Sequence, residues 1–249
     1  MKSSENPTRE SLIQKLLHYY DDLKPHSPYM MEIAAIAFDI EDHLEEHAKK
    51  NKESGTPKKH ALVLDCDDTF FSHYFNFKNE NFENTAEQVD RRVRKTDLPI
   101  IPPMHRVYQK AESLNIDIFF VSYRKSIESH PIKEMRPYVI KNLEYHGINI
   151  HESRVFVPSP EEAKVNSVVY KTQVRKNLTE QGYHIIANVG DQPSDFGDYA
   201  ERNFSLPNKL YGPRSLLGTA AHVTTVILFK PDKPSNNEIK SSQKMMTLR

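Results

Sequence analysis

Cysteine is nearly absent from the sequence. The 249 residues include only Cys66, so no disulfide can form within the chain. A single cysteine fits a reducing compartment without requiring one. The chain also lacks an excess of either charge, because 34 Lys and Arg balance 34 Asp and Glu. Bulk charge therefore indicates no nucleic-acid or membrane partner, and any binding of anions must come from a local site.

Long apolar runs are missing too. No stretch approaches the roughly 20 apolar residues that a membrane-spanning helix needs. Residues 1–11 are polar and contain no apolar core of a signal peptide. We therefore expect a cytoplasmic protein, or one that is exported without a conventional signal peptide.

A helical segment is predicted at the N-terminus. Apolar side chains recur there at helical spacing, at Leu12, Ile13, Leu16, Leu17 and Tyr20. A second helix is predicted over residues 29–50, and residues 51–59 have the composition of a linker. We expect residues 1–56 to be a helical appendage that packs on the main domain or binds a partner. Residues 231–249 are expected to be disordered.

The main domain, expected over residues 57–230, alternates apolar runs with helical stretches. The apolar runs occupy residues 61–64, 116–121, 155–157 and 185–189. Helices are predicted over 103–113, 132–146 and 170–181, with Gly147 and Gly182 placed to end the last two. Buried strands that alternate with helices indicate an α/β fold, with a central parallel sheet flanked by helices.

Polar residues follow three of the four apolar runs. The first run is followed by Asp65-Cys66-Asp67-Asp68-Thr69, the second by Ser122-Tyr123-Arg124, and the fourth by Gly190-Asp191. Ligands of open α/β sheets bind at the carboxyl ends of the strands. We therefore expect these three segments to form the functional site.

The Asp65 and Asp67 pair predicts a metal or a shared proton. Residues two apart on a strand share one face, and crowded carboxylates repel unless a cation lies between them or one holds a proton. A divalent metal with a nucleophile/acid pair meets both needs, and Asp191 would complete an all-oxygen ligand set that suits Mg²⁺. The alternative for an isolated D-x-D is a solvated acidic turn or an incidental calcium site.

Ser122 and Lys171 supply the remaining chemistry of the predicted site. Ser122 offers a hydroxyl at the start of a loop, and Lys171 opens a basic helix that on its own would be a solvated face. Residues 190–195 could on their own be a capped turn. Taken together, the nucleophile, metal, hydroxyl and cation match a site for phosphoryl transfer.

These residues resemble the haloacid dehalogenase (HAD) superfamily of phosphohydrolases, whose four motifs occur here in order. They are Asp65-Cys66-Asp67-Asp68-Thr69, Ser122, Lys171, and Gly190-Asp191-Gln192-Pro193-Ser194-Asp195. A narrower resemblance, to class B and vegetative-storage-protein acid phosphatases, rests on Tyr170-Lys171-Thr172 with Arg175, Gly182-Tyr183, and Leu206-Pro207-Asn208 with Tyr211. The resemblance covers about residues 59–211. It implies a Rossmann-like HAD core with a small cap over about residues 70–103.

The resemblance implies a role for each motif residue. Asp65 is expected to attack phosphorus, and Asp67 to protonate the leaving group and then activate water. Mg²⁺ is expected on the Asp65 carboxylate, the Asp67 carbonyl and Asp191, with Asp195 nearby. Ser122 and Lys171 are expected to hold the phosphoryl oxygens. Substrate contacts are expected from Thr69, Tyr123 and Arg124.

The sequence departs from the family pattern at three features. Asp68 stands where Glu is usual, and Tyr123 stands where Gly is expected, so its phenol would crowd the pocket mouth or stack on an aromatic substrate. The usual secretion signal is missing.

The cap segment is rich in aromatic residues and arginine, which indicates either cap packing or an aromatic wall with a basic rim.

Three functions follow from this pattern. The leading prediction is a Mg²⁺-dependent phosphomonoesterase of the acid phosphatase type. A second uses the same chemistry on phosphotyrosine, a phosphoprotein or a nucleotide. A third is a catalytically silent binding or storage protein, against which the intact Asp65, Asp67, Lys171 and Asp191 argue. The substrate and the oligomeric state stay open.

Overall fold

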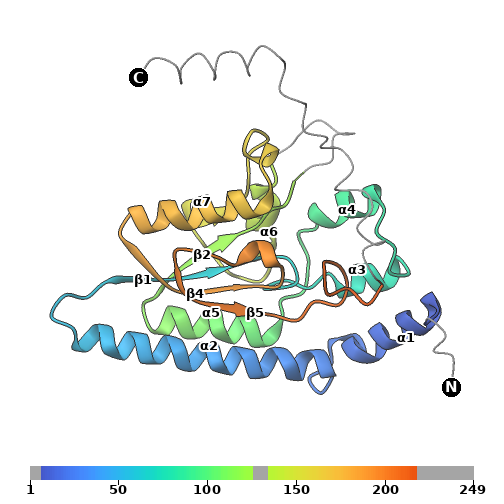
Figure 1. The fold of residues 1–249 in the computed structure, drawn as a ribbon, viewed down its shortest axis with the longest axis horizontal. Helices are drawn as coiled ribbons and strands as arrows, with labels where there is room; N and C mark the ends of the chain where they lie inside the picture. Colours follow the sequence, from blue (N-terminus) through green and yellow to red (C-terminus); the bar gives the residue numbers. More distant parts are fainter. Residues whose placement is uncertain (1–6, 126–133, 218–249) are drawn as a thin grey trace, which may run out of the picture.

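The fold is built on a parallel sheet of five strands in the order β3-β2-β1-β4-β5. The structure is a computed structural model, and it describes residues 7–125 and 134–217. The strands are β1 (Lys59–Leu64), β2 (Asp117–Val121), β3 (Val155–Phe156), β4 (Tyr183–Gly190) and β5 (Ala200–Ser205). The predicted α/β class with a central parallel sheet flanked by helices is confirmed (Figure 1).

Side chains of β1 alternate between two apolar layers, as the pleat of a strand requires. Ala61 and Val63 face the helix α7 (Ser167–Glu180), where they pack with Phe119. Leu62 and Leu64 face the opposite side and join the larger core. Both faces of the strand are buried, which explains its continuous apolar run.

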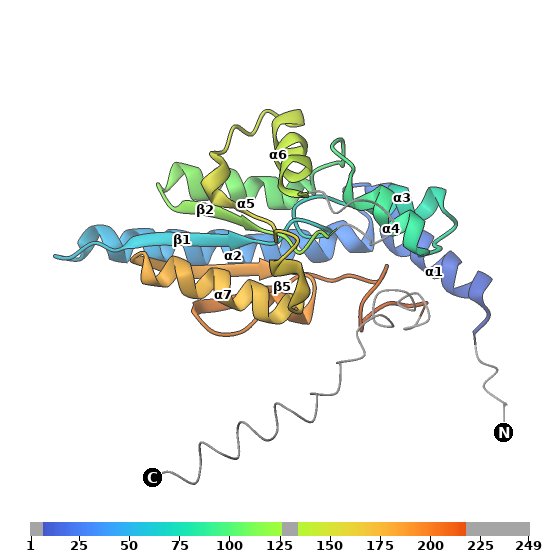
Figure 2. The same cartoon turned by 90° about the horizontal axis from the view of Figure 1, so that it is seen from above.

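Helices cover both faces of the sheet (Figures 1 and 2). The larger core lies under α2 (Pro28–Glu53), α5 (Pro102–Ser113) and α6 (Arg136–Tyr145). Helix α7 covers the other face, where Tyr170, Val174 and Leu178 are buried. Short 3₁₀ turns occur at Asp21–Leu23, Glu152–Arg154, Glu162–Lys164 and Pro193–Asp195.

The N-terminal helices pack directly on this core. Helix α1 (Arg9–Tyr20) begins at Thr8, whose side chain accepts a hydrogen bond from the Ser11 backbone N–H. Helix α2 begins in the same way at Ser27, followed by Pro28 at its first position. One stripe of α2 is buried in the core, at Tyr29, Met30, Ile33, Ala37, Ile40, Leu44 and Ala48.

Two short helices lie beyond the carboxyl ends of the strands (Figure 1). They are α3 (Tyr74–Asn79) and α4 (Ala86–Val93), inserted between β1 and α5. Thr85 and Gln88 form a reciprocal capping box that starts α4. These helices fall within the segment expected to be a small cap.

The predicted elements match the observed ones in type, with shifted ends. The four predicted strands correspond to β1, β2, β3 and β4. The helix expected over 132–146 begins only at Arg136, and residues 132–133 lie outside the described residues, as does the tail 231–249. Strand β5 was not predicted. Its residues are mostly exposed at the sheet edge and form no apolar run.

Within the described ranges, 7–125 and 134–217, no helix is long and apolar enough to cross a membrane.

Candidate active site

The ends of β1 and β4 and the N-terminal half of α7 bring charged groups together. The Asp65 backbone N–H donates to the Val189 carbonyl at 2.9 Å and so continues the strand ladder into the site. Asp68 then adopts a left-handed backbone, with φ of 54°, and its N–H bonds the Phe71 carbonyl. The tight turn that follows β1 aims Asp65 and Asp67 toward the pocket.

Lys171 is buried between two carboxylates. Its Nζ donates to Asp65 Oδ1 at 2.5 Å and also to Asp195 Oδ1. Burial alone would lower the pKa of Lys171, but the two carboxylates outweigh that effect and raise it. The predicted cation therefore lies beside the predicted nucleophile.

Asp65, Asp191 and Asp195 form a buried group whose nearest carboxylate oxygens all lie within 4.8 Å of one another. Burial raises the pKa of Asp65 to about 7, with Lys171 only partly opposing it. Burial and the two neighbouring carboxylates also raise the pKa of Asp191 well above its usual range. One lysine cannot balance the negative charge of three buried carboxylates. Since their oxygens are hard ligands, a divalent cation such as Mg²⁺ fits the group.

Neutral donors hold Asp191 in this group. Its Oδ2 accepts hydrogen bonds from Asn208 Nδ2 at 2.6 Å and from Gln192 Nε2 at 2.5 Å. Thr69 Oγ1 donates to its Oδ1 at 3.2 Å. None of these donors carries a charge, so they orient the carboxylate without replacing a cation.

Asp67 lies in a different environment. Its carboxylate accepts hydrogen bonds from Arg124 Nε at 2.9 and 3.0 Å and from Arg124 Nη2 at 2.6 Å. His73 Nε2 lies 2.7 Å from Oδ1, and Ser122 Oγ donates to Oδ2 at 3.3 Å. Burial alone would raise the pKa of Asp67, but the charge of Arg124 and the hydrogen bond from His73 hold it well below its usual range.

Arg124 thus supplies positive charge at the Asp67 carboxylate, whereas the cation expected beside Asp65 stays a prediction. In the described part of the chain, the carboxylates grouped for a metal include Asp65, Asp191 and Asp195 but not Asp67. A role for the Asp67 carbonyl as a metal ligand stays a prediction. That oxygen lies 3.4 Å from the Tyr211 hydroxyl.

The other predicted site residues fall into two groups. Thr69 and Ser122 are buried, and both hydroxyls bond the site carboxylates rather than line the pocket. Tyr123 and Arg124 line the pocket. The Tyr123 hydroxyl donates to the carbonyls of Ala163 and Val165, which anchors the ring at the rim.

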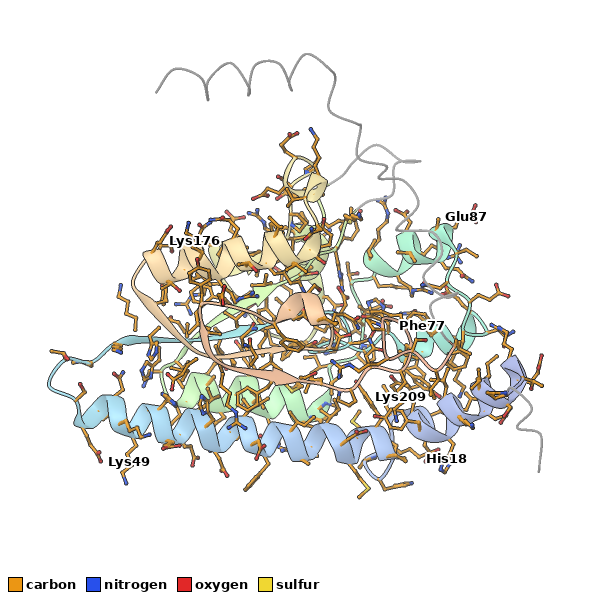
Figure 3. All side chains as sticks on the ribbon, in the orientation of Figure 1. His18, Lys49, Phe77, Glu87, Lys176 and Lys209 are labelled. Carbon is orange, nitrogen blue, oxygen red and sulfur yellow. The ribbon has the colours of Figure 1, made fainter. Side chains whose placement is uncertain are left out.

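A cavity of about 320 Å³ opens from these residues toward α3 and α4, in the segment expected to be a cap. Its cap side is lined by Phe77, Asn84, Val89, Arg92, Val93 and Tyr211. Phe77 stacks on Tyr211 with ring centroids 5.8 Å apart, and the Arg92 guanidinium lies 4.1 Å from the Phe77 ring centre. Figure 3 shows Phe77 beyond the carboxyl ends of the strands. The cavity therefore joins a charged end to a largely apolar one.

Sequence reasoning missed His73 and gave Arg92 no individual role. His73 stands four residues beyond the first motif, and only that closeness could have drawn attention to it. Arg92 belongs to a run of basic residues between Arg91 and Lys95, and the sequence does not show which of them is buried. Its guanidinium is held by Glu80 and Asn84.

The chain belongs to the family described as HAD superfamily, subfamily IIIB (Acid phosphatase), whose sequence model matches residues 13–214. The predicted resemblance is therefore confirmed. The structure of the class C acid phosphatase from Bacillus anthracis has the same fold, with a TM-score of 0.60 and 18% identity over 96% of this chain and 98% of that one.

Several plant proteins are similar in sequence to the chain. The stem 28 kDa glycoprotein of Glycine max is 32% identical over 61% of this chain and 60% of its own length. Vegetative storage protein 1 of Arabidopsis thaliana is 30% identical over 60% of this chain and 54% of its own. Acid phosphatase 1 of Solanum lycopersicum is 26% identical over 74% of this chain and 69% of its own. The chain thus spans little more than half the length of the storage protein.

Proposed function

We propose that the protein hydrolyses phosphate monoesters through a phosphoaspartyl intermediate on Asp65, with Mg²⁺ held by Asp65, Asp191 and Asp195. The observation that carries this proposal is the separation of two carboxylate environments. Asp65 lies against Lys171 in the buried acidic group, whereas Asp67 lies against Arg124 and His73. Membership of an acid phosphatase family supports the same reaction.

The two aspartates would divide the chemistry. Asp65 would attack phosphorus, while Asp67 would give a proton to the leaving oxygen and then accept one from water. The substrate phosphate would compete with Asp67 for the Arg124 guanidinium, which frees that carboxyl to take up the proton that it then donates. When bound, Mg²⁺ would neutralise negative charge on the carboxylates and the phosphoryl oxygens.

Lys171 and Arg124 would orient the substrate, and Ser122 would act through its hydrogen bond to Asp67. Lys171 Nζ already lies 2.5 Å from Asp65 Oδ1, within reach of an oxygen on the phosphorus that Asp65 attacks. Ser122 is buried next to Asp67, and Tyr123 forms the rim. Donors fixed before the reaction stabilise charge in the transition state without further reorganisation. Thr69 would act by holding Asp191.

The cap end of the cavity favours an aryl phosphate as the first substrate to test. Phe77 and Tyr211 present aromatic surface there, and Arg92 is already paired with Glu80. A phosphotyrosine side chain and a nucleotide are the second candidates, since each carries a flat ring.

The test is hydrolysis of p-nitrophenyl phosphate between pH 4 and pH 8, with Mg²⁺ and then with excess chelator. We expect activity that the chelator removes and that Asp65→Asn reduces to background. Asp39→Asn is the matched control, because Asp39 is exposed on α2 and does not line the pocket, so it should leave the rate unchanged.

Two outcomes would contradict the proposal. Activity that survives Asp65→Asn would exclude Asp65 as the nucleophile. No activity on aryl phosphate, phosphotyrosine peptide or nucleoside monophosphate would instead favour the storage or binding role that the names of several relatives state.

A further inference from the structure

His73 is buried beside Asp67 and has two separate tasks. Its backbone N–H donates to Asp68 Oδ1 at 2.8 Å, just before the first residue of α3. That bond belongs to the turn and does not involve the ring. The imidazole is 6% exposed, and its Nε2 lies 2.7 Å from Asp67 Oδ1. The ring therefore needs an explanation of its own.

The ring donates a hydrogen to Asp67. Two guanidinium nitrogens of Arg124 donate to that carboxylate, so it is ionised and can only accept. His73 Nε2 must then carry the hydrogen. The Nδ1 atom on the other side of the ring lies 3.5 Å from the Asn76 side-chain amide.

The two oxygens of Asp67 are held unequally. Oδ1 accepts from His73 at 2.7 Å and from Arg124 Nη2 at 2.6 Å. Oδ2 accepts from Arg124 Nε at 2.9 Å and from the Ser122 hydroxyl at the longer distance of 3.3 Å. Oδ2 is the more loosely held oxygen, so it is the one able to exchange a proton with a bound substrate.

We propose that His73 is a positioning residue that fixes Asp67 through Oδ1 and thereby presents Oδ2 to the leaving group. This inference deepens the proposed function and rests on it. In the first step, after the substrate phosphate has drawn Arg124 away and Oδ2 has taken up a proton from solvent, an Asp65 oxygen bonds to phosphorus, the bond from phosphorus to the leaving oxygen breaks, and that oxygen takes the proton from Oδ2. In the second, a water oxygen bonds to phosphorus, Oδ2 takes the water proton, and the bond to Asp65 breaks.

Leaving-group dependence tests this role. An alkyl phosphate needs the proton because an alkoxide leaves poorly, whereas p-nitrophenolate leaves with little help. His73→Met removes the donor at similar volume. We expect it to lower kcat/KM for an alkyl phosphate by about 10- to 100-fold, and for p-nitrophenyl phosphate by about threefold or less. His73→Gln can donate to the same oxygen and should restore most of the loss on the alkyl substrate.

A matched control and a second variant complete the design. His60→Met removes another buried histidine at the opposite end of β1 and should leave both rates unchanged. If His73→Met fails to melt cooperatively, His73→Asn replaces it, because the shorter amide cannot reach Oδ1. Equal losses on the two substrates, or no recovery with His73→Gln, would overturn the role of His73 alone. A wild-type protein inactive on both substrates would overturn the proposed function as well.

Discussion

Identical side chains two residues apart acquire opposite properties in this site. Burial raises the pKa of Asp65, whereas Arg124 and His73 outweigh burial and lower the pKa of Asp67. The difference comes from the partners, since Lys171 is shared between Asp65 and Asp195, whereas Arg124 donates to the Asp67 carboxylate and to the Val93 and Lys95 carbonyls. A nucleophile and an acid/base group need such a division of environment.

At the scale of single residues, Gly190 is a position where one added carbon should disturb the acidic group. A Cβ there would lie 2.3 Å from Asp195 Cβ and Oδ2, closer than side-chain atoms can approach. We expect Gly190→Ala to displace the Asp195 carboxylate, weaken Mg²⁺ binding about tenfold or more, and destabilise the fold by about 1–3 kcal/mol. Titration calorimetry with Mg²⁺ and urea unfolding measure the two effects.

Gly55→Ala is the control for this substitution. A Cβ at Gly55 would meet nothing within 4 Å. Its Mg²⁺ affinity and unfolding midpoint should match those of the wild type. Unchanged Mg²⁺ affinity in Gly190→Ala would mean that Asp195 does not contribute to the metal site.

At the scale of elements, helix α2 contributes to the same core as the sheet. Leu44 is fully buried on its inner face, and Phe38 is 60% exposed on its outer face. We expect Leu44→Ala to lower the free energy of unfolding by about 2–5 kcal/mol, because it leaves a cavity in the core. Phe38→Ala, on the same helix, should change it by about 0.5 kcal/mol or less. Urea denaturation of both variants checks this.

A single unfolding transition that shifts with Leu44→Ala would show that α2 unfolds with the sheet. Two unfolding transitions, of which Leu44→Ala shifts only the one at lower urea, would contradict that expectation. They would favour an independent helical unit. The division into residues 1–56, 57–230 and 231–249 stays a prediction until such a measurement is made.

At the scale of the whole molecule, a group of histidines joins α2 to the sheet at the end opposite the site. His43 and His47 from α2 lie in a chain of ring contacts with His60 from β1 and His184 from β4. Glu201 on β5 pairs with His47 and His184. Burial, followed by the charges of His184 and His47, lowers the pKa of His60 from 6.5 to about 4.

The stability of the protein should therefore fall as the pH drops from about 6.5 to about 4. In that range the unfolded chain binds a proton at His60 and the folded chain does not, so protonation favours unfolding. Between pH 7 and pH 5, the urea midpoint of the wild type should fall further than the midpoint of His60→Met. An equal fall in both proteins would show that His60 does not drive the effect.

The sequence by itself determined the fold class and which charged residues meet at one edge of the sheet. Buried parallel strands form continuous apolar runs, and the polar residues that follow β1, β2 and β4 must meet at one edge of the sheet. Asp65, Lys171 and Asp191 could be identified because each stands at the end of a strand or the start of a helix.

Only the tertiary structure decided how those groups are paired. The sequence placed Asp65 and Asp67 together, but the contacts of Lys171 and Arg124 across the sheet separate them. The His73 ring meets Asp67 across a turn in which Asp68 has a left-handed backbone. Strand β5 is set by pairing with β4 rather than by apolar content. Local patterns report burial and backbone preference, whereas the partner of a charged side chain depends on residues that are distant in the chain and meet only in the folded protein.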